Sequence, residues 1–339
     1  MMFTPVKIAN FVCENRSARS PTATGTCSQE TGVPEQAFYD FYEKQAAGHP
    51  GLMVQEHSFV SWRGHAGHKQ LGLHSDEMIQ YHKRANDLMR SVNPNIRICC
   101  QLAHVGANCD KPDKLVIDTA TQEDFDTIIQ EFTAAASRAL LAGYDCVQIH
   151  SGHTYLLSRS ISSYYNHRTD SYSHQTFKLL RQVLEGVRTV NIPVGVKLQC
   201  DDFINGHTMN ARSAVQLLKE LKFDFVEVTG GGNENAEYGT LRQGSGKYYY
   251  KHVIQLFKEE GVLQMMPVIV SGGFQSVSDA EEALNDGVAM VGFSRKFLRD
   301  PMFLVQEKDS KKCVRCNMCI KDLVECREVK CAMHKRDVD

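Results

Sequence analysis

Three side chains able to act on one small molecule follow a short apolar run near the middle of the chain. His150 and His153 stand three residues apart, and Tyr155 follows two residues later. Two imidazoles can donate hydrogen bonds to a ligand oxygen, and a phenol can give a proton to a developing carbanion. The trio therefore predicts a site that polarises a conjugated carbonyl. Metal ligation and a structural role are the alternatives for the histidines, although zinc needs three or four ligands and HExxH is absent.

Two further polar residues interrupt apolar runs that have the character of strands. Lys197 lies inside the run Pro193–Gln199, where a buried cation is costly unless an anion or a set of acceptors meets it. One interpretation is that Lys197 places a positive charge beneath an electron-accepting ring. The alternatives are that burial neutralises the lysine, or that it pairs with Asp201 or Asp202. Gln101 offers an amide donor and acceptor suited to the edge of a pyrimidine-like ring.

Two turns in the last third of the chain suit a phosphate group. Gly272 and Gly273 follow Ser271 at the end of one apolar run, and Ser294 and Arg295 end the next. Each turn precedes a helical stretch, so backbone N–H groups, a helix N-terminus and a guanidinium could converge on one anion. The alternative is that the two glycines only close a tight turn. The GxGxxG pattern of a dinucleotide-binding sheet is absent.

Regularly alternating elements must position these residues. Seven apolar, β-branched runs are typical of strands buried on both faces. They are Gly51–Glu56, Ile96–Ala103, Asp145–His150, Pro193–Gln199, Phe225–Thr229, Pro267–Ser271 and Met290–Ser294. Helical spacing with capping signals lies between them. Those stretches are Ser75–Ser91, Thr121–Ala142, His174–Val190, Asn210–Leu221 and Ser278–Asn285.

An eighth strand is less visible in the sequence. Ser17–Ser20, ahead of Pro21, supplies it before a helix around Glu35–Ala47. Eight strand and helix units predict an α/β fold, a (β/α)8 TIM barrel, with a doubly wound open sheet as the alternative. Active-site residues of such a barrel follow the strand ends. We therefore expect the polar residues described above to converge on one rim.

Composition excludes several classes of function. The chain has 38 Lys+Arg against 40 Asp+Glu in 339 residues, a formal charge of −2, so we expect no binding of nucleic acid or membrane. No apolar run approaches the roughly 20 residues of a membrane span, and the start lacks an export signal, so we expect a cytoplasmic protein. Cysteines inside apolar runs, such as Cys99, Cys100 and Cys146, are expected to be small buried hydrophobes.

Further short motifs accompany the candidate residues in a fixed order. They are Phe3-Thr4-Pro5, Asn15-Arg16, Gln101-Leu102-Ala103-His104, Ile149-His150, Asn166-His167-Arg168-Thr169-Asp170, Ser271-Gly272-Gly273, Arg295 and Asp300-Pro301. This combination resembles the old yellow enzyme family of FMN-dependent NAD(P)H oxidoreductases. The resemblance implies a (β/α)8 barrel with FMN at its C-terminal rim and NAD(P)H as the hydride donor.

The resemblance also implies a role for each candidate residue. Those expected to hold the flavin are Ser20, Pro21, Thr22, Ala23 and His57 along the ring, Gln101 at the pyrimidine edge, Lys197 near N1, and Gly272, Gly273, Ser294 and Arg295 at the phosphate. His150 and His153 would anchor a substrate carbonyl, and Tyr155 would be the proton donor in a ping-pong reduction of an activated alkene. Lys197 stands where many members carry arginine, so a point charge replaces a fork of donors.

Five cysteines crowd near the C-terminus. Cys313, Cys316 and Cys319 form CxxCxxC, and Cys331 follows. This segment is similar to the iron–sulfur segment of the larger branch of the family, which contains 2,4-dienoyl-CoA reductase and trimethylamine dehydrogenase. The similarity implies a [4Fe–4S] cluster on these four thiolates, with zinc or free thiols as alternatives. Cys326 is the surplus cysteine.

We therefore expect an FMN-binding barrel over residues 1–305 and a cysteine-rich segment over residues 306–339. Two other functions stay open: a flavin and iron–sulfur redox sensor or electron carrier, and an amine dehydrogenase or demethylase on the same barrel. The glycine-rich stretch Gly230–Gly246 is expected to be a mobile lid that sets substrate choice. The sequence does not specify the substrate or the preference for NADH or NADPH. It also leaves open whether the chain forms a homo-oligomer and whether it has an external electron partner.

Overall fold

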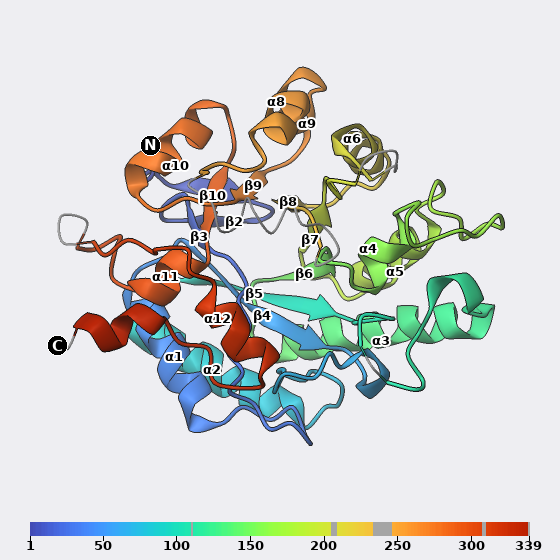
Figure 1. The fold of residues 1–339 in the computed structure, drawn as a ribbon, viewed down its shortest axis with the longest axis horizontal. Coiled ribbons are helices and arrows are strands. Elements are labelled where there is room, and N and C mark those ends of the chain that lie inside the picture. The colour runs from blue at the N-terminus through green and yellow to red at the C-terminus, as the bar shows by residue number, and fades with distance from the viewer. Residues whose placement is uncertain (110, 205–208, 233–245, 307–309, 338–339) are drawn as a thin grey trace.

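A computed structural model describes residues 1–109, 111–204, 209–232, 246–306 and 310–337 of the chain. Its centre is a closed barrel of eight parallel strands in the order β10-β3-β4-β5-β6-β7-β8-β9 (Figure 1). The strands are β3 (Ser17–Arg19), β4 (Leu52–Phe59), β5 (Arg97–Ala103), β6 (Cys146–Ser151), β7 (Val194–Gln199), β8 (Phe225–Thr229), β9 (Val268–Ser271) and β10 (Met290–Phe293). The predicted (β/α)8 barrel is confirmed.

The strands form where the sequence has uninterrupted apolar runs. Every residue of β6, β7, β8 and β10 is buried, because one face of each strand points into the barrel and the other meets the helices. The predicted small buried cysteines are confirmed at Cys99, Cys100 and Cys146, whose thiols are free and fully buried. Polar residues therefore gather where strands end.

Helices surround the barrel (Figure 1). The longer ones are α1 (Gln36–Ala47), α2 (Met78–Val92), α3 (Gln122–Leu141), α5 (Lys178–Arg188), α6 (Ala211–Glu220), α8 (Lys251–Glu259) and α10 (Val277–Asn285); the short ones are α4 (Leu156–Ser160), α9 (Val262–Met265), α11 (Arg295–Arg299) and α12 (Met318–Val324). In α5 the buried side chains fall on one stripe, from Leu179 to Val187. In the described ranges no helix is long and apolar enough to cross a membrane.

Side-chain caps fix where several helices begin. At α3, the Thr121 hydroxyl accepts from the Asp124 backbone N–H at 3.2 Å, and the Asp124 carboxylate accepts from the Thr121 N–H at 2.8 Å. The side chains of Asn210 and Ser276 each accept from backbone N–H groups in the first turns of α6 and α10. Such caps each stabilise a helix by about 1 kcal/mol, and they set the ends of the loops that reach the rim.

A hairpin that sequence reasoning missed closes the N-terminal end of the barrel. Strands β1 (Val6–Ile8) and β2 (Phe11–Cys13) pair antiparallel. Phe11 lies in one buried apolar cluster with Leu52 and Phe225, which are the first residues of β4 and β8. The N-terminal end of the barrel is therefore plugged, and the C-terminal rim is left for a site.

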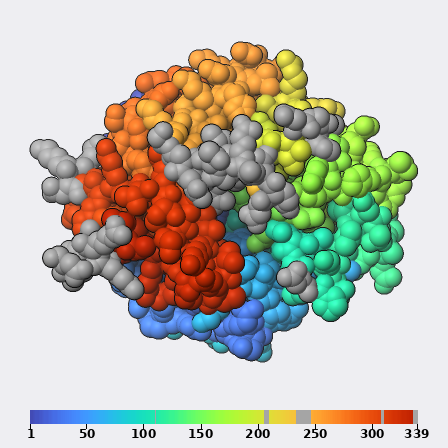
Figure 2. Space-filling view, in the orientation of Figure 1, coloured from blue at the N-terminus to red at the C-terminus, as the bar shows by residue number. Residues whose placement is uncertain are grey.

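The C-terminal segment runs back across the barrel rim. The Val329 N–H donates to the Thr24 carbonyl at 2.8 Å, and Arg315 donates to the Gly273 carbonyl at 2.9 Å. Figure 2 shows the segment, in red, as a continuous part of the surface between the orange and blue parts of the chain. The cysteine-rich segment is thus packed on the barrel and contributes to the rim.

Candidate active site

A cavity of about 440 Å³ lies at the C-terminal ends of the barrel strands. All the barrel residues that the sequence indicated as site residues line it. They are Ser20, Pro21, Thr22, Ala23, His57, Gln101, His150, His153, Tyr155, Lys197, Gly272, Gly273, Ser294 and Arg295. Residues distant in sequence meet there because the strands of a parallel barrel all end at one rim.

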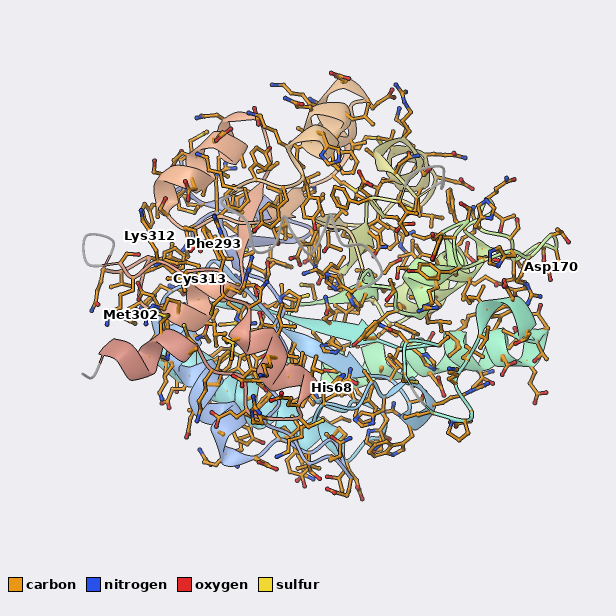
Figure 3. The ribbon with its side chains drawn as sticks, viewed as in Figure 1. His68, Asp170, Phe293, Met302, Lys312 and Cys313 are labelled. Atoms are coloured by element: carbon orange, nitrogen blue, oxygen red, sulfur yellow. The ribbon has the colours of Figure 1, made fainter. Side chains whose placement is uncertain are left out.

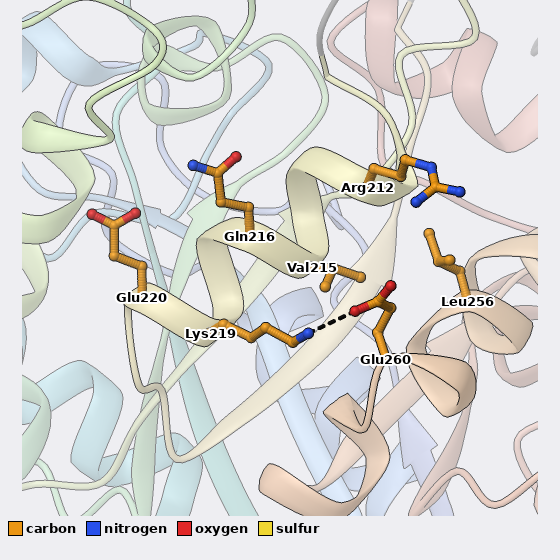
Figure 4. Close-up of a pocket in the computed structure, with 7 residues that line it drawn as sticks. All are labelled: Arg212, Val215, Gln216, Lys219, Glu220, Leu256 and Glu260. Atoms are coloured by element: carbon orange, nitrogen blue, oxygen red, sulfur yellow. Dashed lines mark hydrogen bonds and ion pairs between the residues drawn. The ribbon is translucent and has the colours of Figure 1, made fainter.

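A second hollow lies among the outer helices, between α6 and α8 (Figure 4). Its lining includes Arg212, Val215 and Leu256, and Lys219 Nζ donates to Glu260 Oε2 across it at 2.6 Å. This ion pair is exposed, so it contributes little to stability. No predicted site residue reaches this hollow in the described part of the chain. The rim cavity is therefore the candidate active site.

Four rings form a cluster at one end of the rim cavity. Ring centroids of His150 and His153 are 5.2 Å apart, those of His150 and Tyr155 are 4.9 Å apart, and those of His57 and Tyr155 are 5.5 Å apart. The chain turns sharply after β6, with φ of 55° at His153 and 60° at Thr154. Adjacent non-glycine residues in this left-handed region are uncommon, and the turn brings the three side chains back toward one another.

Hydrogen bonds orient three of these rings. His153 shares a hydrogen bond between its Nε2 and the Thr229 hydroxyl at 3.0 Å, and its backbone N–H donates to Gln199 at 2.7 Å. The Tyr155 hydroxyl lies 3.0 Å from His57 Nε2. His150 Nδ1 is buried without a hydrogen-bond partner among the described residues. A buried polar atom normally has a partner, so this nitrogen points to a ligand.

Burial sets the protonation state of the ring cluster. Desolvation, with His68, Lys197 and His65 nearby, lowers the pKa of His57 to about 4. Burial and the neighbouring His153 hold the pKa of His150 well below its usual range, and burial raises the pKa of the Tyr155 phenol. Near neutral pH the imidazoles of His57 and His150 are therefore uncharged, and the Tyr155 phenol keeps its proton.

A buried polar network lies beneath the cavity. Lys197 Nζ donates to Glu227 at 3.0 Å, and Glu227 also accepts from the Ser271 hydroxyl at 2.7 Å and from Gln148 at 3.0 Å. Gln148 in turn accepts from Gln101 at 2.7 Å. The network joins β5, β6, β7, β8 and β9, so it fixes the residues at the floor of the cavity as one unit.

The alternative that Lys197 pairs with Asp201 or Asp202 was wrong. Neither Asp201 nor Asp202 pairs with it; Asp201 pairs with His252 at 2.9 Å, while Glu227 is the anion that meets Lys197. The reason is geometric: in parallel β7 and β8 Lys197 and Glu227 are register partners, whereas the aspartates lie beyond the end of β7. A charged residue inside the apolar run Phe225–Thr229 was the available signal.

The Lys197 and Glu227 side chains form an ion pair rather than a neutral pair. Burial would raise the pKa of Glu227, but the Lys197 charge and the hydrogen bonds from Ser271 and Lys197 outweigh it and hold that pKa below its usual value. Glu227 is therefore a carboxylate. The positive charge of Lys197 reaches the cavity partly neutralised, which weakens it as a charge beneath an electron-accepting ring.

The residues expected to hold a phosphate lie together. Gly272 and Gly273 have φ of 139° and 83°, and a Cβ on Gly273 would come within 2.6 Å of the Tyr249 ring. Only glycine fits that turn. Arg295 donates to Asn317 Oδ1 at 2.6 Å and to the Tyr249 hydroxyl at 3.2 Å. Sequence reasoning missed Tyr249 and Asn317, because only the fold brings them beside Arg295.

Of the C-terminal cysteines, Cys319 lines the rim cavity. Figure 3 labels Cys313, which lies in the same segment. Burial raises the pKa of the Cys319 thiol, Arg295 lowers it, and the charges of Cys313, Cys316 and Cys331 raise it further. The four thiols are therefore close enough to influence one another. Yet no group of three His, Cys, Asp or Glu residues in the described ranges is arranged to hold a metal ion. Four thiols are the donor set of an iron–sulfur cluster, but in the described ranges they are not arranged around one metal position.

Glu56 is a fully buried carboxyl beside the rim. It accepts from the Thr24 hydroxyl at 2.6 Å and from the Thr24 N–H at 2.9 Å, one residue after Ala23 of the cavity lining. Burial raises its pKa to about 7, although the Thr24 hydrogen bonds and Arg19 act in the opposite direction. Glu56 thus ties the loop after β3 to β4 through a group that titrates near neutrality.

Glu56→Gln should remove a pH dependence of stability. Because the folded pKa lies above the unfolded one, folded protein binds more protons between about pH 4.5 and 7, and stability falls as pH rises through that range. The free energy of unfolding of the wild type should therefore fall by about 3 kcal/mol across it relative to the variant. Urea unfolding of the wild type and of Glu56→Gln, at about pH 4.5 and at about pH 7, measures this difference. Parallel pH profiles would contradict the assignment.

A (β/α)8 barrel with a histidine pair, a tyrosine and a double glycine at its C-terminal rim defines the class: a flavin-dependent oxidoreductase. The chain belongs to the NADH:flavin oxidoreductase / NADH oxidase family, whose model matches residues 1–312, and this is the old yellow enzyme family. It is an FMN-dependent NAD(P)H oxidoreductase.

Curated relatives of similar length support this assignment. The chain is 29% identical over 323 residues to an NADPH dehydrogenase of Bacillus pumilus (strain SAFR-032). It is 28% identical over 322 residues to an NADPH dehydrogenase of Bacillus subtilis (strain 168). Each match covers 89% of this chain and 92% of the relative.

Solved structures show the same fold in both shorter and longer proteins. An old yellow enzyme homologue from Zymomonas mobilis matches with a TM-score of 0.74 and 20% identity over 92% of this chain and 94% of its own. A 2-naphthoyl-CoA reductase matches with a TM-score of 0.87 and 19% identity over 97% of this chain. Histamine dehydrogenase from Rhizobium sp. 4-9 matches with a TM-score of 0.83 and 19% identity, also over 97% of this chain. This chain spans 56% and 51% of those two chains, about half of each.

Proposed function

We propose that this protein reduces activated alkenes such as enones and enoates, with Tyr155 as the proton donor. The observation that carries the proposal is the buried His150 Nδ1 without a partner among the described residues, in one ring cluster with His153 and the Tyr155 hydroxyl. FMN, held by the residues of the rim cavity, would supply hydride transfer from NAD(P)H to the β-carbon of the alkene. The chain must then hold the substrate oxygen and supply one proton.

His150 and His153 suit the first task. An imidazole that is neutral near pH 7 can donate one hydrogen bond without bringing a charge that would favour a different ligand. Donors held in place by protein contacts stabilise the negative charge that develops on a carbonyl oxygen as hydride arrives at the β-carbon. The Thr229 contact to His153 holds that donor in place.

Tyr155 suits the second task. Its raised pKa keeps the proton on the phenol until a strong base, the developing carbanion at the α-carbon, is present. The aspartates near the rim are already paired, Asp201 with His252 and Asp202 with Ser162. A phenol is also a weak enough acid not to protonate other groups first.

The residues that would hold FMN fit its parts. The Gly272 and Gly273 turn leaves backbone N–H groups without side chains in front of them, and Arg295 adds a cation for a phosphate. Gln101 offers amide groups to the pyrimidine edge, and the loop Ser20–Ala23 with His57 would line the ring. Lys197 would act as one half of a neutralised pair with Glu227.

We further propose that Cys313, Cys316, Cys319 and Cys331 hold a [4Fe–4S] cluster. Their spacing and mutual proximity support it, and Cys319 itself lines the rim cavity. Such a cluster would supply one-electron transfer to an external partner or to a flavin bound in the rim cavity. We accordingly propose a division into a barrel, residues 1–305, and a cysteine-rich segment, residues 306–339.

An absorption spectrum of protein purified without air tests both proposals. We expect flavin bands that bleach on addition of NADPH and return on addition of 2-cyclohexenone, together with a broad shoulder from the cluster. Bleaching without return would contradict alkene reduction. Flavin bands without the shoulder, and without bound iron, would contradict the cluster and leave zinc or free thiols. A protein that binds no flavin would contradict the proposed site as a whole.

A further inference from the structure

The proton donor of the rim cluster already has a partner on the protein. The Tyr155 hydroxyl lies 3.0 Å from Nε2 of His57, which comes from β4, while Tyr155 comes from the loop after β6. His57 was expected only to line a flavin. The alkene reduction proposed above, on which this inference rests, needs no partner for the phenol, so the contact calls for its own explanation.

A phenol that gives up its proton here becomes a costly anion. Burial raises the pKa of Tyr155, and the nearby Cys109 raises it further, which means that the phenolate is poorly stabilised by its surroundings. An anion in such a place needs a hydrogen-bond donor within reach. His57 Nε2 is within hydrogen-bond distance of the hydroxyl, and both side chains line the same cavity.

We propose that His57 is a positioning residue for Tyr155: its Nε2–H donates to the phenol oxygen, aims the phenol proton at the substrate, and replaces that proton after transfer. With the oxygen accepting from His57, the O–H bond is left to point elsewhere in the cavity. The opposite arrangement, with the phenol donating to Nε2, would turn the proton away from a substrate. Only one tautomer of His57 therefore serves the reaction.

The proton balance is simple. The Tyr155 O–H bond breaks as a C–H bond forms at the α-carbon of the substrate. The phenolate takes the Nε2 proton of His57, and Nδ1 takes a proton from solvent water. The imidazole stays neutral throughout and changes tautomer, then returns to the first tautomer by exchange with solvent. Each turnover thus moves one proton from solvent to substrate.

The surroundings of His57 favour a neutral imidazole over an imidazolium. Among the described residues, the titratable side chains that act on it or meet it are Tyr155, His150, Lys197, His65 and His68. None of these is a carboxylate, and the cationic Lys197 opposes a second positive charge. His57 is only half-buried at the cavity wall, so solvent can reach it. A neutral relay that exchanges with solvent fits these contacts.

The test compares His57→Phe, which removes the donor, with His57→Gln, whose amide can still donate to the phenol oxygen. In each holoenzyme, flavin reduced by NADPH is mixed with 2-cyclohexenone, and the rate of reoxidation is measured. We expect a fall of about tenfold or more in His57→Phe, less than for loss of the general acid itself, and recovery to within about threefold in His57→Gln. His167→Phe, the same change on an exposed loop, is the matched control.

Two further readouts separate positioning from a structural role. The affinity for cyclohexanone, an unreactive carbonyl ligand read from the flavin spectrum, should stay within about twofold in His57→Phe, because His150 and His153 would bind it. In a Tyr155→Phe background, His57→Phe should cause no further loss beyond about twofold, since it acts through the phenol. A weakened carbonyl affinity, or losses that multiply, would overturn the role.

The outcomes also distinguish this inference from the function beneath it. If the wild type is reduced by NADPH but not reoxidised by 2-cyclohexenone, alkene reduction fails and this inference fails with it. If the wild type turns over and His57→Phe reoxidises at the wild-type rate, the proposed function stands and the role of His57 is overturned. A slow His57→Phe that His57→Gln restores, with carbonyl affinity retained, supports the inference.

Discussion

Tyr155→Phe is expected to slow reoxidation of the reduced protein by an enone by about 100-fold or more, the usual effect of removing a general acid. Reduction by NADPH should change far less, because no protein group has to supply a proton in that half-reaction. The ring remains in place, and only the hydroxyl that lies beside His57 and the His150 ring is lost. Rapid mixing of each half-reaction separately measures the two rates.

The matched control is Tyr81→Phe. Tyr81 is half-buried on α2 and does not line the rim cavity, so the same loss of one hydroxyl should leave both half-reactions at the wild-type rates. Equal slowing of both half-reactions in Tyr155→Phe would contradict the assigned role, since it would mean that the hydroxyl positions the cofactor. An unchanged enone rate would show that the proton comes from another group.

The barrel and the rim residues could be predicted because both leave strong signals in the sequence. A strand buried on both faces is a run of apolar residues, and the polar residues that follow it lie on the rim of a parallel barrel. His150 was found at the end of such a run, and Lys197 was found because a cation interrupts one. The N-terminal hairpin was missed because its strands Val6–Ile8 and Phe11–Cys13 are too short to show any periodicity.

Contacts between strands could not be predicted from the sequence. The contact of Tyr155 with His57 and the pairing of Lys197 with Glu227 depend on the register and curvature of the closed barrel, which no single segment encodes. The same holds for Asn317, which reaches Arg295 only because the C-terminal segment folds back over the rim. Most of the expected lid, Gly230–Gly246, lies outside the described residues, so its role stays a prediction.

Lys197→Met is expected to destabilise the fold by about 3–5 kcal/mol, the usual effect of removing one partner from a buried ion pair. Glu227 would keep its hydrogen bonds from Ser271 and Gln148, but it would be a buried carboxylate without a cation. The double variant Lys197→Met with Glu227→Gln removes both charges and should recover most of the loss. Urea unfolding with FMN in fixed excess, repeated at a second FMN concentration, separates stability from cofactor affinity.

The pH dependence of these variants gives a second, independent test. In the wild type the folded pKa of Glu227 lies below its usual value, so its stabilising effect is present above the unfolded pKa and is lost only as acid protonates the folded protein. Without Lys197, burial dominates and the folded pKa moves above the unfolded one. Relative to the wild type, stability of Lys197→Met should then fall between pH 5 and 8, by up to about 1.4 kcal/mol per pH unit. The double variant carries no titrating group at this position, so its pH profile should parallel that of the wild type. A single variant whose profile also parallels that of the wild type would mean that Glu227 finds another cation, and that the Lys197 and Glu227 pair is not what holds the floor of the cavity together.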